Sequence, residues 1–92
     1  MPYIKKKDRP QFDKLIKQIV DQFKLGGKMD ILGVEGNLNY VFSKTIKELW
    51  KNHRCYAHAN AIMGVLECVK QEFYRKEVIP YEEEKIKENG EI

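Results

Sequence analysis

Apolar residues recur along this chain at spacings of three and four, which is the period of an α-helix. The first run covers residues 8–24, where Asp8 is the predicted N-cap, Pro10 lies in the first turn and Gln11 completes a capping box. Two glycines after this run predict the end of the helix. The apolar face of this helix consists of Phe12, Leu15, Ile16, Ile19, Val20 and Phe23.

Three further helices are predicted, at residues 37–52, 56–78 and 81–89. The segment before them, residues 28–36, holds apolar residues between glycines and predicts either a short extended segment or an ordered loop. Pro80 disfavours helix at the residue before it, so it is expected to bend or break the last rod. The sequence therefore predicts an all-α fold, with residues 1–92 as one domain of three to four helices. The third helix has a main apolar face of Ala59, Ile62, Leu66, Val69 and Phe73.

Small side chains share a narrow lane on the third helix at 100° per residue. Its four members are Ala57, Ala61, Gly64 and Cys68. A glycine in the middle of a helix is costly unless another backbone comes close to it. The lane therefore predicts a close helix contact, either within the chain, with the first or second helix, or between subunits. Small helical domains often self-associate to bury enough surface, so a homo-oligomer is one of these two expectations.

A second stripe on the same helix mixes polar and apolar groups. The candidates for a polar pocket are Glu67, Gln71, Tyr74 and Arg75. If Glu67 is buried it must be paired or neutral, and Arg75 is its expected partner. An acid, a cation and a phenol together occur in catalytic clefts, but structural ion pairs that fix helix register give the same pattern. The structural interpretation is favoured.

The segment "HRCYAH", residues 53–58, raises the question of a metal site. A structural zinc takes four Cys/His ligands in tetrahedral array. His58 and Cys68 are ten residues apart on one predicted helix, about 15 Å along its axis, which is too far to share an ion. Three candidate ligands remain, His53, Cys55 and His58. Three ligands with an open position would form a catalytic-type site, but no carboxylate base lies nearby in the sequence. We therefore predict no metal and no cofactor.

Charge changes the picture at the two ends of the chain. The net charge is +3, but residues 5–9 carry four basic groups against Asp8, and residues 82–92 carry five glutamates against Lys85 and Lys87. We expect these oppositely charged ends to lie near each other, within a subunit or across an interface. The basic run is short and the other cations are interleaved with acids, which argues against nucleic acid. With no signal peptide and no apolar run near 20 residues, we expect a soluble, cytoplasmic protein outside membranes.

The segments "GNLNYVFSKTI" and "IMGVLECVKQEFYRKEVIPYEEEKIKENGEI", with the opening "MPYIKKKDRP", resemble a family of small bacterial, archaeal and phage proteins classed as a domain of unknown function. Its members typically read Glu-Leu-Asn-Tyr, Gly-Val-Leu-Glu-Cys, Glu-Phe-Tyr-Arg-Arg, Pro-Tyr-Glu and Asn-Gly-Asp. This chain departs with Asn37, Lys76 and Glu91 at three of those positions. The resemblance covers about half of the chain, supports the fold and implies no activity.

Two functional hypotheses follow. The first is a small helical interaction module that self-associates through the third helix, with another protein as a further possible partner. The second is an all-α enzyme that binds a nucleotide or phosphate ligand through Glu67, Tyr74 and Arg75. Glu67 and Glu72 are five residues apart and point about 140° away from each other, which argues against a magnesium cluster on one helix. The interaction module is the favoured hypothesis, and it implies a role without catalysis.

Overall fold

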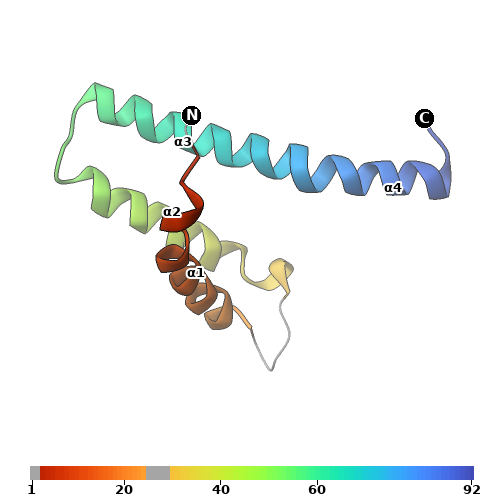
Figure 1. The fold of residues 1–92 in the computed structure, drawn as a ribbon, viewed down its shortest axis with the longest axis horizontal. Coiled ribbons are helices and arrows are strands. Elements are labelled where there is room, and N and C mark those ends of the chain that lie inside the picture. The colour runs from red at the N-terminus through yellow and green to blue at the C-terminus, as the bar shows by residue number, and fades with distance from the viewer. Residues whose placement is uncertain (1–2, 25–29) are drawn as a thin grey trace. The chain divides into compact units, whose positions relative to one another are not determined.

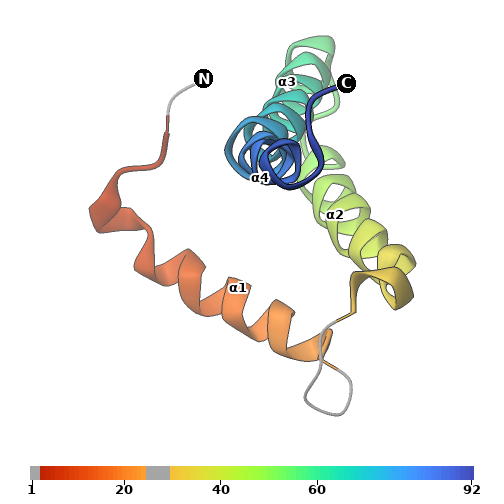
Figure 2. The same ribbon diagram turned by 90° about the vertical axis from the view of Figure 1, so that its right-hand side faces the viewer.

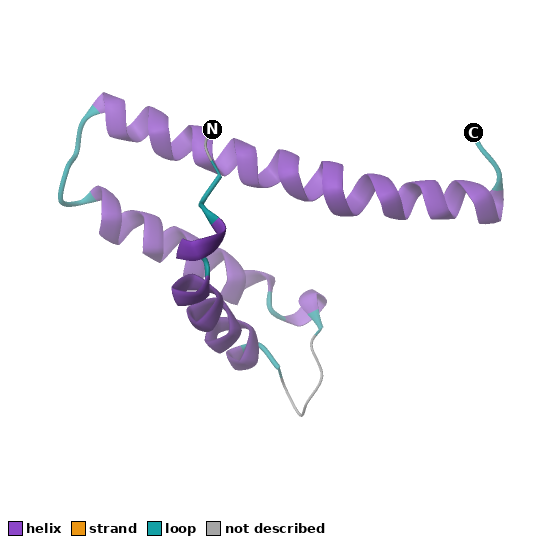
Figure 3. Cartoon of the chain, viewed as in Figure 1, coloured by secondary structure: helices purple, strands orange, loops and turns teal. Residues whose placement is uncertain are grey.

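The computed structural model describes residues 3–24 and 30–92, and these residues form helices and loops without a strand (Figure 3). The prediction of an all-α fold is confirmed. The elements in chain order are η1 Lys6–Asp8, α1 Pro10–Gln22, η2 Ile31–Gly33, α2 Glu35–Trp50, α3 Tyr56–Phe73, η3 Tyr74–Val78 and α4 Ile79–Asn89 (Figure 1). Contacts along the chain divide it into two compact units, residues 2–52 and residues 53–92, and each is described by itself.

The start of α1 differs from the prediction. Asp8 belongs to η1 and Arg9 is the N-cap of α1, without a side-chain hydrogen bond to the helix end. Gln11 Nε2 donates to the Asp8 carbonyl oxygen at 3.4 Å, so the predicted capping box is wrong. A short 3₁₀ turn runs directly into α1, and the Arg9 carbonyl oxygen accepts hydrogen bonds from the backbone N–H groups of Phe12 and Asp13. The guanidinium of Arg9 instead donates to the Ile4 carbonyl at 3.1 and 3.2 Å and ties the N-terminal arm to α1.

The segment before α2 is an ordered loop with one 3₁₀ turn over its described part, residues 30–34. The Asp30 carboxylate accepts a hydrogen bond from the Leu32 backbone N–H at 2.9 Å, which caps η2. Val34, at 3% exposure, is the one buried apolar residue among the described residues. α2 then begins at Glu35, two residues before the predicted start. The glycines predicted to end the first helix, at 26 and 27, lie outside the described residues.

Residues 53–92 form one unit that consists almost entirely of a single rod. α3, η3 and α4 follow each other without interruption (Figure 1), and the view along the rod shows α3 and α4 end-on (Figure 2). η3 is a π-helix, and the N–H of Ile79 donates to the Tyr74 carbonyl five residues earlier. The predicted break at Pro80 is therefore wrong. A proline inside a helix lacks an N–H and its ring clashes with the carbonyl four residues back, and the wider π turn accommodates both.

Charged side chains pair along the helix surfaces at separations of three and four residues. Side-chain hydrogen bonds from Lys51 and Lys44 hold the pKa of Glu48 below its usual range, and a hydrogen bond from Lys17 does the same for the pKa of Asp21. Such pairs are typical of solvated helix faces and add little stability. No helix in the described part of the chain is long and apolar enough to cross a membrane.

Candidate interaction surface on the C-terminal helix

The main apolar face of α3 is largely uncovered. We call its five residues, Ala59, Ile62, Leu66, Val69 and Phe73, the seam. Leu66 is 38% exposed, Val69 53% and Phe73 63%, while Ala59 and Ile62 are half-buried. Large apolar side chains are the residues most often found inside proteins, and a contiguous exposed row of them marks an interaction site. The sequence predicted this face, and the structure places all five residues on α3.

The lane of small residues lies on another side of α3, about 150° round the helix from the seam. Ala57, Ala61 and Gly64 are exposed and Cys68 is half-buried. A Cβ built on Gly64 meets nothing within 4 Å. Polar residues occupy both sides between the seam and the lane, with Asn60, Glu67 and Gln71 on one side and His58 and Glu72 on the other. The seam and the lane are thus two separate faces of α3, divided by polar residues.

The predicted polar pocket forms only in part. Gln71 Nε2 donates to Glu67 Oε1 at 3.0 Å, and Glu67 is exposed rather than buried. Arg75 forms its ion pair with Glu72 and not with Glu67, the carboxylate that it was expected to pair with if Glu67 were buried. The reason is distance: eight residues of helix separate Glu67 from Arg75 by about 12 Å, whereas residues three apart are surface neighbours. Lys76 Nζ also lies 3.3 Å from the Glu72 carboxylate.

A hollow of about 390 Å³ lies beside the π turn. It is lined by Lys70, Gln71, Phe73, Tyr74 and Val78. Gln71 and Tyr74 both line this hollow, and Glu67 adjoins it through its hydrogen bond to Gln71. Arg75 is not among the lining residues, and Lys70, which the sequence analysis missed, supplies the cation. π turns occur often at functional sites, but the lining Phe73 and Tyr74 are both more than a third exposed, which makes the hollow shallow.

The "HRCYAH" segment forms the loop and first turn that lead into α3. The Nδ1 atom of His58 lies 2.9 Å from the His53 carbonyl oxygen, and the two imidazole rings meet edge to face at 5.6 Å. Cys55 is exposed at the N-cap of α3. Over residues 3–24 and 30–92, no three His, Cys, Asp or Glu side chains are placed to hold one metal ion. This contact joins the loop before α3 to the first turn of the helix.

One family model covers the entire chain, residues 1–92, and its description is a domain of unknown function, DUF6899. The chain belongs to the DUF6899 family. The match extends over the whole sequence, including the basic start and "HRCYAH". The comparisons with curated proteins and with solved structures found no match. Family membership therefore confirms the resemblance at the level of the domain.

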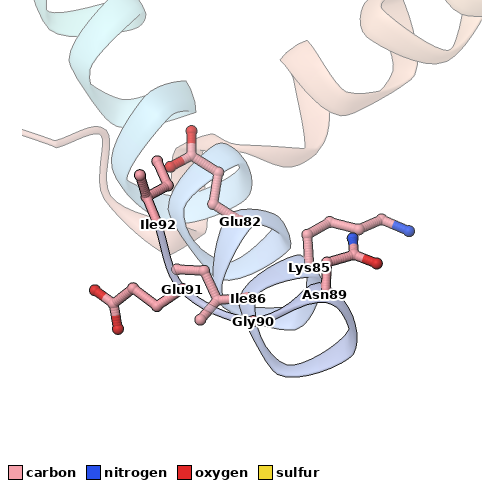
Figure 4. A pocket seen from close by; sticks show the side chains of 7 residues that line it. All are labelled: Glu82, Lys85, Ile86, Asn89, Gly90, Glu91 and Ile92. Atoms are coloured by element: carbon pink, nitrogen blue, oxygen red, sulfur yellow. The ribbon is translucent and has the colours of Figure 1, made fainter.

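The C-terminus of this DUF6899 chain holds a second hollow of about 390 Å³, which the sequence analysis did not predict. Gly90 has a φ of 85°, in the region that favours glycine, and the chain turns away from the helix direction there, so that Glu91 and the fully exposed Ile92 form one side of the hollow (Figure 4). The remaining lining residues are Glu82, Lys85, Ile86 and Asn89. Lys85 is paired with Glu88 at 3.1 Å and lies over the Tyr81 ring at 5.5 Å. The glycine near the helix end was the only sequence signal for this turn.

Proposed function

We propose that this DUF6899 chain is a helical interaction module that self-associates through α3. The observation that carries the proposal is the exposed seam on a unit made of one rod. A single rod cannot bury a stripe of its own side chains, so another element has to cover Leu66, Val69 and Phe73. Full burial of one large apolar side chain contributes about 1.5–3 kcal/mol, and these side chains are roughly half exposed. Covering the seams of two copies would therefore contribute several kcal/mol of apolar burial, which offsets the translational and rotational entropy lost on association.

The second hypothesis, an enzyme that binds a nucleotide or phosphate ligand, has less support. Its cation, Arg75, is held by Glu72, and the hollow beside Tyr74 is shallow and lined mainly by apolar atoms. Pockets for small ligands usually enclose most of the ligand surface and gather several polar groups. The lane of small residues remains a candidate contact for another helix, from the same chain or from a second copy.

The test is the mass of the full-length chain in solution, measured by sedimentation over a range of concentrations. We expect the wild-type chain, of 10.9 kDa, to reach twice that mass, and Leu66→Glu to remain a monomer because it places a charge in the seam. Asn60→Glu is the matched control, since it adds the same carboxylate to the polar stripe of the same helix and should still dimerise. A wild-type chain that stays at 10.9 kDa at every concentration would contradict the proposal.

A further inference from the structure

The seam has the spacing of a two-helix contact. Its five residues follow each other at intervals of three, four, three and four, which is a seven-residue repeat over two heptads. This repeat keeps one stripe facing a single partner helix, whereas packing against several helices requires a broader face. All five residues lie in α3, before the π turn changes the helix geometry. The partner that the spacing fits is therefore one helix with the same repeat.

We infer that the partner is a second copy of α3, and that the two helices run antiparallel about a two-fold axis at Leu66. This inference rests on the proposed self-association and adds its orientation and register. Leu66 is the middle residue of the seam, so the axis sets Leu66 against its own copy. Ala59, seven residues before it, then faces Phe73 of the second copy, seven residues after it. Ile62 and Val69 face each other in the same way.

The sizes of these side chains favour the antiparallel arrangement. Each end of the contact pairs the smallest seam residue, Ala59, with the largest, Phe73, so the two helices remain at an even separation. A parallel pair in register would set Phe73 against Phe73 at one end and Ala59 against Ala59 at the other. Interiors pack without voids, and facing large and small side chains is the usual way to fill a layer. The parallel pair would be wedged apart at one end and underfilled at the other.

The charges of α4 favour the same orientation. Residues 82–92 carry five glutamates against Lys85 and Lys87, a balance of −3. A parallel pair would place two such segments side by side, which like charges oppose. In the antiparallel pair, α4 of each copy lies beyond the contact. Its acidic first turn comes about one helical turn past Arg54 of the other copy, near the positive N-terminal end of that copy's α3.

The test measures distances between spin labels on the full-length chain by pulsed dipolar spectroscopy. Cys55→Ser and Cys68→Ala remove the native thiols, and the second change keeps the lane small. One cysteine at a time is then placed at Glu67, Asn60 or Lys85, which are all exposed. Along an antiparallel pair, equivalent labels at 67, 60 and 85 are separated axially by about 3, 18 and 57 Å, at 1.5 Å per residue from the axis.

We expect the label distances to increase in that order, with the pair at residue 85 longer than about 50 Å. Sedimentation of each labelled chain accompanies the spectroscopy. A dimeric mass with short distances at all three positions would overturn the antiparallel pairing and leave self-association intact. A monomeric mass without dipolar coupling would overturn the proposed function, and the pairing with it.

Discussion

The replacement of Gly64 by leucine tests whether another helix packs on the lane of small residues. A Cβ at Gly64 meets nothing within 4 Å, so this chain alone offers no steric objection to a side chain there. With the lane open, Gly64→Leu would stabilise α3 by about 0.5–1 kcal/mol, because glycine is the poorest helix former after proline. With a helix backbone packed on the lane, leucine would overpack the contact at a cost of about 1–3 kcal/mol. Gly64→Leu should therefore raise the stability of the protein if the lane is open and lower it if a helix packs on the lane.

We expect the packed situation and therefore a net loss of stability. The assay is urea and thermal unfolding followed by helical circular dichroism, with the mass of the assembly measured in parallel. For a domain of this size, 1 kcal/mol shifts the melting temperature by about 4–8 °C. Gly36→Leu is the control, since Gly36 lies in the first turn of α2 and a Cβ there also meets open space. A Gly64→Leu chain with an unchanged or raised melting temperature and an unchanged mass would refute a close helix contact on the lane.

Two further predictions concern metal and the ends of the chain. Purified protein should contain no stoichiometric zinc and keep its helical circular dichroism in a chelator, because within the described part of the chain no metal-binding group of ligands forms near His53, Cys55 and His58. One zinc per chain, lost on replacement of His53 and His58, would contradict this. If the basic residues 5–9 lie near the acidic residues 82–92, as predicted, amide exchange of residues 82–92 should be faster in high salt and after deletion of residues 1–7. Exposed ion pairs contribute only about 0.2–1 kcal/mol each, and salt screens them within about 10 Å at 0.1 M. Equal protection of these residues in all four combinations of chain and salt would show that the two ends do not interact.

The helices of this chain could be predicted from sequence because each carries its own periodic pattern. The face with Leu66 and Phe73 repeats at the helical period, and that local signal is enough to place α3. Errors arose where local rules compete. Pro80 disfavours a regular helix, but a helix can admit a proline by widening into a π turn, and no sequence rule chose between widening and breaking.

The candidate site was harder to predict because it depends on which of several possible neighbours a side chain selects. Arg75 can reach both directions along its helix, and the carboxylate three residues away, Glu72, is nearer than Glu67. The helical pattern did not indicate that Lys70 would line the hollow beside Tyr74. Which partner covers the seam and the lane depends on contacts beyond a single helix, and helical periodicity carries no information about them.

The π turn before Pro80 also sets the direction in which the side chains of α4 point. A π turn closes its hydrogen-bonded ring one residue later than an α turn, so it is equivalent to the insertion of one residue into a regular helix. Every side chain of α4 is consequently rotated by about 100° from the direction that an uninterrupted helix would give it. Gain or loss of a single codon within residues 74–78 would turn Tyr81 and Ile86 toward a different side while the register of α3 stayed the same. The side-chain directions of α3 and α4 can thus change independently, through the length of the turn between them.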